Sequence, residues 1–141
     1  MKFLVINGAN LNLLGTREPE IYGQKTLDEI NNNLTDFGKG QEIELDFFQS
    51  NFEGELIEKI QTADGYDGII INPAAHTHYS LAVADAISAV KTPVVEVHLS
   101  NIFARDRETS ITAKGSIGVI CGFGEESYKL GMVALKNHIE G

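Results

Sequence analysis

The residues of this sequence that could carry acid–base chemistry fall in three polar segments, residues 7–23, 72–78 and 96–107. The last segment opens with Glu96 and His98, which are two residues apart and share one face if they lie on a strand. A carboxylate beside an imidazole fixes its tautomer, and histidine exchanges protons near neutral pH. The pair is therefore a candidate general acid with an orienting partner.

A second candidate pair lies in the first segment, where Arg17 and Tyr22 are five residues apart. A phenol with a pKa of about 10 is a poor base at neutral pH, but a neighbouring cation lowers that pKa. Arg17 is the obvious cation, and Tyr22 is then a candidate base. The alternative is that Tyr22 only packs against the sheet, as most loop tyrosines do, and that Arg17 is a solvated surface charge.

Metal binding is not indicated. His76 and His78 are two residues apart, but no cysteine, third histidine or carboxylate stands beside them at ligand spacing. The single cysteine, Cys121, lies in an apolar run and has no second thiol with which to form a disulfide or a zinc site. We therefore expect no metal and a cytoplasmic location.

Length and charge narrow the class of protein further. With 141 residues, 43% of them hydrophobic, the chain is long enough for one core, so we expect a single domain over residues 1–141. The apolar run at residues 1–6 is too short to span a membrane. A net charge of −9 argues against nucleic-acid binding, so any anionic ligand needs a local cluster of cations.

The elements that must position the polar segments follow from hydrophobic periodicity. Short apolar runs alternate with stretches of helical period, which is typical of βαβ units on a parallel sheet. The expected strands are residues 3–6, 43–48, 68–71, 94–98 and 117–121. Apolar residues at helical spacing predict four helices, within residues 27–37, 56–60, 81–90 and 128–139. Thr26 is the expected N-cap of the first helix, with Glu29 completing a capping box.

Five strands with right-handed crossovers predict a flavodoxin-like doubly wound α/β fold, with strand order 2-1-3-4-5 and helices on both faces. Ligands in such sheets bind outside the carboxyl ends of the strands, where the strand order reverses. The three polar segments follow the first, third and fourth expected strands. We therefore expect them to meet at that end of the sheet.

Four longer motifs resemble the type II 3-dehydroquinate dehydratases, in the same order and over nearly the whole chain. They are residues 10–23, 49–56, 71–78 and 94–101. The resemblance implies a lyase of the shikimate pathway or of quinate breakdown. It would convert 3-dehydroquinate to 3-dehydroshikimate by anti elimination of water through an enolate, without a cofactor.

The resemblance also implies catalytic roles. Tyr22 would remove the proton next to the ketone with help from Arg17, and His98, oriented by Glu96, would protonate the departing hydroxyl. Asn12 would hold a water near the enolate oxygen. Elimination beside a ketone needs such a base, an acid and a donor to the enolate oxygen, so the residue types suit the implied chemistry.

Substrate-binding roles follow from the same resemblance. The substrate carboxylate would be bound by Asn72 and the backbone N–H groups of Leu99 and Ser100, with His78 on the ring hydroxyls. Asp85 matches a position that reaches the site of a neighbouring subunit, and members commonly form dodecamers built from trimers.

The sequence departs from the family pattern at residues 104–110, where the segment is shorter than usual. Members carry two arginines there, which Arg105 and Arg107 would supply, with Arg107 inheriting the second role. His76 replaces a common tyrosine, Phe52 a histidine and Ala84 an arginine. The last change weakens the expected intersubunit contact near Asp85.

Two other functions are compatible with the sequence. A flavodoxin-like fold could bind a flavin or nucleotide, but the loop after the first strand lacks the continuous run of Ser, Thr and Gly residues that would cradle a phosphate. A catalytically inactive relative could serve as an interaction protein. The presence of Arg17, Tyr22, Glu96 and His98 disfavours this, whereas the altered segment at residues 104–110 leaves it open.

Overall fold

A five-stranded parallel sheet forms the centre of the computed structural model, which describes residues 1–16, 18–104 and 109–141. The strand order is β2-β1-β3-β4-β5, as the sequence predicts. Each expected strand is present within one residue of its expected ends. The strands are β1 (Lys2–Asn7), β2 (Glu44–Gln49), β3 (Gly68–Asn72), β4 (Val94–His98) and β5 (Gly118–Cys121).

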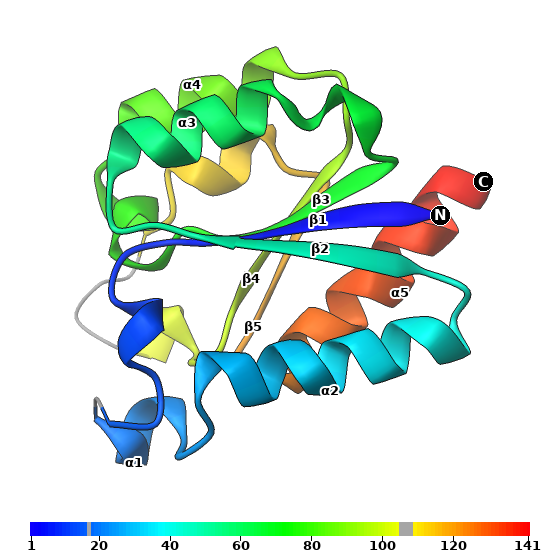
Figure 1. The fold of residues 1–141 in the computed structure, drawn as a ribbon. Coiled ribbons are helices and arrows are strands. Elements are labelled where there is room, and N and C mark those ends of the chain that lie inside the picture. Colours follow the sequence, from blue (N-terminus) through cyan, green and yellow to red (C-terminus); the bar gives the residue numbers. More distant parts are fainter. Residues whose placement is uncertain (17, 105–108) are drawn as a thin grey trace.

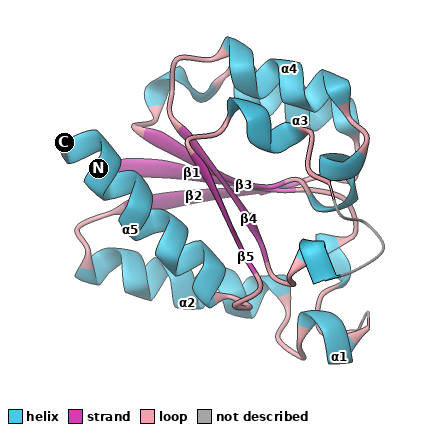
Figure 2. Cartoon of the chain, turned by 180° about the vertical axis from the view of Figure 1, so that it is seen from behind, coloured by secondary structure: helices cyan, strands magenta, loops and turns pink. Residues whose placement is uncertain are grey.

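Helices cover both faces of the sheet. Figure 1 shows α2 (Leu27–Gly40) and α5 (Glu126–Glu140) against one face, and α3 (Glu53–Gln61) and α4 (Leu81–Ala89) against the other. The view from behind in Figure 2 shows the same layers. The described part of the chain also contains the short helix α1 (Pro19–Tyr22) and five 3-10 turns. The turns are η1 (Leu11–Leu13), η2 (Ala63–Gly65), η3 (Ala74–His78), η4 (Ile102–Ala104) and η5 (Thr112–Gly115).

The core has one layer on each face of the sheet. Phe3 and Val5 of β1 pack with residues of α2 and α5, whereas Leu4 and Ile6 pack with residues of α3 and α4. Because β1 is covered on both faces, its side chains from Phe3 to Asn7 are all buried. This explains why the strand reads as a continuous apolar run rather than an alternating one.

The start of α2 confirms the expected N-cap. The hydroxyl oxygen of Thr26 accepts a hydrogen bond from the backbone N–H of Glu29 at 3.2 Å. Asp28 and Glu29 place negative charge in the first turn, where the helix dipole favours it. α2 therefore begins at a defined residue, shortly after the first polar segment at residues 7–23.

The buried face of α4 differs from the expected one. The helical spacing of Leu81, Ala84, Ile87 and Val90 in the sequence predicts that these residues form the buried face. Leu81 is instead 69% exposed, and the buried residues are Val83, Ala86 and Ile87. Nearly every residue from 81 to 90 is apolar, so the pattern has no unique face. Tertiary packing against α3 then decides which side is buried.

No helix in the described ranges is long and apolar enough to cross a membrane.

Candidate active site

The end of β4 carries the pair that the sequence singled out. Nε2 of His98 lies 2.8 Å from Oε2 of Glu96, and the two residues are 4% and 0% exposed. Val95 and Val97 point to the α2 and α5 side, so the alternation of the strand turns Glu96 and His98 to the opposite face. The expected shared face and contact are confirmed.

Three hydroxyl groups surround the carboxylate of Glu96. Oγ1 of Thr112 lies 2.5 Å from Oε1, while Oγ of Ser110 and Oγ1 of Thr77 lie 2.7 and 3.0 Å from Oε2. Burial raises the pKa of Glu96, but the hydrogen bonds from His98, Thr112 and Ser110 outweigh it and hold this pKa below its ordinary value. Glu96 is therefore an anion at neutral pH.

Sequence reasoning missed these hydroxyl groups. Thr77 comes from η3, and Ser110 and Thr112 lie shortly after Arg105 and Arg107 in the sequence. The only signal in the sequence is a cluster of hydroxyl residues at 109–112, which is common in loops and carries no chemistry by itself. Their role depends on the way β4 brings Glu96 between two distant segments.

The loops after β1 and β3 meet closely at the point where the strand order reverses. The backbone N–H of Gly8 donates to the carbonyl of Asn72 at 2.8 Å, and a Cβ at Gly8 would collide with the carbonyl oxygen of Pro73. Glycine is therefore required for this approach. The contact confirms that the first two polar segments lie together.

Asn72 is buried at the end of β3 in a chain of polar contacts. Its Oδ1 accepts from the N–H of Ala74 at 3.0 Å, and its Nδ2 donates to the phenol oxygen of Tyr128 at 3.0 Å. The phenol in turn donates to Oδ1 of Asn7 at 2.6 Å. Because a backbone N–H can pair only with an acceptor, the amide orientation of Asn72 is fixed, with one Nδ2 hydrogen left beyond the bond to Tyr128.

The phenol of Tyr128 stays neutral. Burial is the main influence on Tyr128 and raises its pKa well above the ordinary value, although the hydrogen bond from Asn72 acts in the opposite direction.

Ala74 has a backbone φ of +55°, in the left-handed region that alanine rarely occupies. Such strain is held by surrounding contacts and is common at functional sites.

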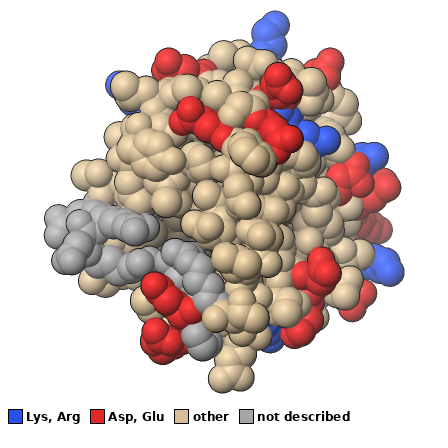
Figure 3. All heavy atoms as spheres, turned by 60° about the vertical axis from the view of Figure 1, so that its left-hand side comes forward, with Lys and Arg blue, Asp and Glu red and all other residues tan. Residues whose placement is uncertain are grey.

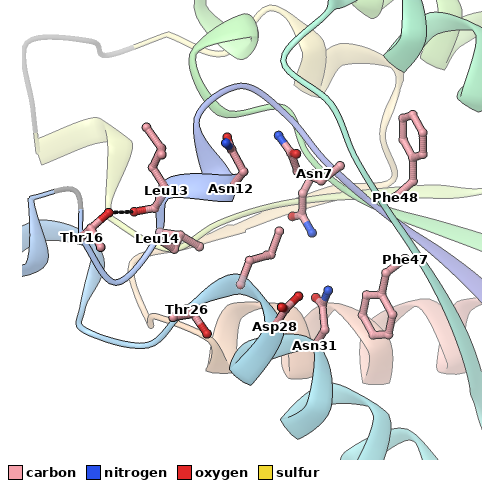
Figure 4. Close-up of a pocket in the computed structure, with 12 residues that line it drawn as sticks. Asn7, Asn12, Leu13, Leu14, Thr16, Thr26, Asp28, Asn31, Phe47 and Phe48 are labelled. Carbon is pink, nitrogen blue, oxygen red and sulfur yellow. Dashed lines mark hydrogen bonds between the residues drawn. The ribbon is translucent and has the colours of Figure 1, made fainter.

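Asn12 lies on η1 and borders a pocket of about 600 Å³. Figure 4 shows Asn12 and Asn7 on one side of this pocket and Asp28 and Asn31 of α2 on another. Among the described residues, the lining does not include Asn72 or the residues at the end of β4. Asn12 is therefore close to the reversal point, but its pocket opens toward β2 rather than toward the pair on β4.

The remaining binding candidates fall into two groups. Nδ1 of His78 lies 2.6 Å from the carbonyl oxygen of Thr109, which follows Arg105 and Arg107 in the sequence. Leu99 is buried and Ser100 half-buried directly after β4. Asp85 is exposed on α4. The structure thus brings His78, Leu99 and Ser100 to the carboxyl end of the sheet and leaves Asp85 on the surface.

Four candidates are not placed. Arg17, Arg105 and Arg107 lie outside the described residues, and so does the side chain of Tyr22, whose backbone ends α1. Figure 3 looks toward the carboxyl ends of the strands, where acidic side chains are more prominent than basic ones in the described part of the surface. No group of three or more His, Cys, Asp or Glu residues in this part is arranged to hold a metal ion.

Comparison with known proteins gives a consistent match over the length of the chain. A model of the family described as dehydroquinase class II matches residues 1–136. A 3-dehydroquinate dehydratase of Geotalea daltonii is 56% identical over 143 aligned residues, covering 99% of both chains. One from Clostridium perfringens is 54% identical, again covering 99% of both.

Solved structures agree with these sequence matches. A type II dehydroquinase from Butyrivibrio crossotus superposes with a TM-score of 0.94 at 44% identity, covering 96% of this chain and 97% of that one. A type II dehydroquinase from Propionibacterium acnes gives a TM-score of 0.90 at 38% identity, with 99% and 97% covered. The fold and the sequence therefore point to the same family.

Proposed function

The chain belongs to the class II dehydroquinase family, and we propose that it dehydrates 3-dehydroquinate to 3-dehydroshikimate by anti elimination through an enolate. The observation that carries the proposal is the buried Glu96–His98 pair at the carboxyl end of β4. This is the reaction of the shikimate pathway, which leads to aromatic amino acids, and quinate breakdown uses the same step.

His98 acts as the general acid. Its Nε2 is engaged by Glu96, so Nδ1 is the ring nitrogen that can face the departing hydroxyl. The anionic Glu96 stabilises the protonated imidazole before transfer and holds the ring in one orientation afterwards. A positioned acid of this kind typically contributes about 10²–10⁴-fold to a rate.

Tyr22 is the base, and Arg17 favours its phenolate. The support for these two roles is the match of residues 10–23 to the family motif, together with the physical requirement for a cation beside a basic phenol. Asn12 holds a water for the enolate oxygen. Its position on η1, directly after β1 and at the end of the sheet where the strand order reverses, supports this role.

The substrate carboxylate is bound by the remaining Nδ2 hydrogen of Asn72 and by the backbone N–H groups of Leu99 and Ser100. Asn72 is buried and fixed in orientation, which supports its use as a preformed donor. His78 contacts the ring hydroxyls. Two further roles are implied by the family motif: Arg105 and Arg107 close over the ring, and Asp85 reaches the site of a neighbouring subunit.

The working form is a homododecamer built from trimers, in the cytoplasm, without cofactor or nucleic acid. The exposed position of Asp85 on α4 is consistent with a role across a subunit interface.

A flavin-binding module of the same fold is the rival function. A purified preparation that is colourless and lacks flavin absorbance counts against that rival.

The test is to mix the purified protein with 3-dehydroquinate and follow the ultraviolet absorbance of the conjugated product. We expect turnover that survives EDTA and survives borohydride added with substrate. No lysine occurs in residues 7–23, 72–78 or 96–107, so a lysine imine has no donor in the site loops. Absence of turnover would overturn the function, and inactivation by borohydride would overturn the enolate mechanism.

A further inference from the structure

The buried carboxylate of Glu96 is contacted by two segments that are distant in sequence from β4. Thr77 belongs to η3, Thr112 to η5, and Ser110 lies just before η5. Glu96, Thr77 and Thr112 are all 0% exposed. Bulk water therefore does not reach this carboxylate, and the described groups that hydrogen-bond to it are these hydroxyl groups and His98.

The hydroxyl oxygens also contact one another. Thr77 lies 2.5 Å from Thr112 and 2.7 Å from Ser110, and Ser110 lies 3.2 Å from Thr112. Each hydroxyl carries one hydrogen, so three hydrogens serve all these contacts and the carboxylate as well. The short distances to Glu96 assign the hydrogen of Thr112 to Oε1 and that of Ser110 to Oε2.

This assignment leaves the hydrogen of Thr77 shared among the oxygens of Thr112 and Ser110 and Oε2 of Glu96. Each carboxylate oxygen then receives a direct hydroxyl hydrogen, and Oε2 also receives the His98 ring N–H. Thr112 is the principal hydroxyl donor to Oε1. Its loss would leave that oxygen buried with no donor in the described part of the site.

A backbone hydrogen bond joins the two segments: the N–H of Ile111 donates to the carbonyl of Thr77 at 2.8 Å. Within the second segment, the N–H of Ala113 donates to Oγ of Ser110 at 3.1 Å. A Cβ at Gly115 would lie 2.6 Å from Oγ of Ser88, so η5 also sits directly on α4. The hydroxyl groups are therefore fixed relative to Glu96 rather than free to turn away.

Several titratable groups lie on the elements around Glu96. On the described parts of β4, β5, η3, α3, α4 and η5 they are His98, Cys121, His76, His78, Glu53, Glu55, Glu58, Lys59, Asp85 and Lys114. α5 covers the opposite face of β4 (Figure 1). Of all these groups only His98 contacts the carboxylate. The hydroxyl groups are thus the neutral donors that stabilise the anion.

We propose that Thr112 and Ser110, assisted by Thr77, are positioning residues of the reaction: they keep Glu96 ionised and aimed at His98. None of them needs to touch the substrate. The inference rests on the proposed function, because it assigns these hydroxyl groups a part in the same proton transfer. It predicts that their loss changes the pH dependence of catalysis rather than substrate binding.

The test is the pH profile of kcat/KM for Thr112→Val, which keeps the shape of the side chain and removes the hydroxyl. Without its donor the anion of Glu96 is less stable, so the acid limb should move to higher pH by about one unit, a roughly tenfold change in the ionisation constant. At pH values well above that limb, KM should stay near the wild-type value. Thr112→Ser should restore the wild-type limb, and Ser110→Ala should shift it in the same direction.

Thr92→Val is the matched control. Thr92 precedes the same strand at its opposite end, and its hydroxyl donates to the carbonyl of Ala63 at 3.3 Å. Its loss should leave the acid limb in place. An unshifted limb in folded Thr112→Val and Ser110→Ala, or a failure of Thr112→Ser to restore it, would overturn the inference. If Thr112→Val does not fold, the half-buried Ser110→Ala decides alone.

A second readout separates this inference from the proposed function. The carboxyl infrared band of Glu96, identified by its loss in Glu96→Gln, reports protonation without any turnover. The band should emerge at higher pH in Thr112→Val than in wild type. A wild-type protein without dehydratase activity would overturn the function, whereas an unshifted band would overturn the role of the hydroxyl groups.

Discussion

The phenol oxygen of Tyr128, on α5, lies 3.0 Å from Nδ2 of Asn72 at the end of β3. Through this contact, and the 2.6 Å bond from the same phenol to Asn7, the last helix of the chain fixes the two asparagines that end β1 and β3. The helix therefore takes part in shaping the reversal point of the sheet, although it carries none of the residues that the sequence singled out.

Tyr128→Phe should weaken substrate binding more than turnover. The change leaves Oδ1 of Asn7 without its donor and Nδ2 of Asn72 without its acceptor, so the amide that we propose binds the substrate carboxylate is no longer held. We expect a several-fold rise in KM, with a loss of about 1–3 kcal/mol in the free energy of unfolding. Steady-state kinetics and urea unfolding measure the two effects.

The control for this variant is Tyr66→Phe. The phenol of Tyr66 donates to Asp46 at 2.6 Å at the amino end of the sheet, far from the site loops. It should change stability without changing KM. A Tyr128→Phe protein that folds and keeps the wild-type KM would show that Asn72 does not need this support.

Tyr22 and Arg17 should behave as one catalytic unit. Tyr22→Phe removes the accepting oxygen and little binding surface, so kcat should collapse while KM stays near wild type. Arg17→Ala should lose kcat as well, with residual activity rising toward alkaline pH as the unassisted phenol ionises. The double variant should be little worse than Tyr22→Phe, which pH-dependent kinetics can establish. Near-wild-type turnover in Tyr22→Phe would move the search for the base to His78 or to a water beside Asn12.

Glu125 should contribute to acid sensitivity of the fold. It joins the start of α5 to Lys25, Asn33 and Lys129, at 2.8, 3.1 and 3.3 Å, and its side chain is 10% exposed. Burial raises its pKa, but the bonds from Lys25, Asn33 and Lys129 outweigh burial and lower it below the ordinary value.

A lowered pKa in the folded state means that Glu125 stabilises the protein above the ordinary carboxyl pKa of about 4.3, and that this contribution is lost as the pH falls through the lowered value. Glu125→Gln should therefore cost about 1–2 kcal/mol at neutral pH, and the difference from wild type should shrink in acid. Urea unfolding at several pH values measures it. Glu126→Gln, which removes a 61% exposed partner of Lys129, is the control and should change little. An equal loss at acid and neutral pH would contradict the prediction.

Much of the fold could be predicted because the signals are local. The apolar runs of β1, β3 and β4 and the cap at Thr26 are set by neighbouring residues, and strand order follows from the handedness of crossovers. The face of α4 could not be predicted, because its sequence is apolar nearly all round. Only the position of α3 decides that Val83 is buried and Leu81 is exposed.

In the candidate site, a contact could be predicted where one element carries both partners. Glu96 and His98 share a strand, so their contact follows from the period of two. The hydroxyl groups around Glu96 and the chain from Asn7 through Tyr128 to Asn72 join residues that are 14–121 positions apart. No sequence period links such residues, and their contacts depend on how the elements pack.

The most direct test of the proposed dehydratase chemistry is the turnover number of His98→Asn with 3-dehydroquinate, followed by the absorbance of the conjugated product. Asparagine keeps a polar group beside Glu96 but cannot donate a proton to a leaving hydroxyl near neutral pH. We predict that kcat falls by about 10²–10⁴-fold while KM changes little. A His98→Asn protein that turns over at the wild-type rate would contradict the assignment of the Glu96–His98 pair as the acid of this reaction.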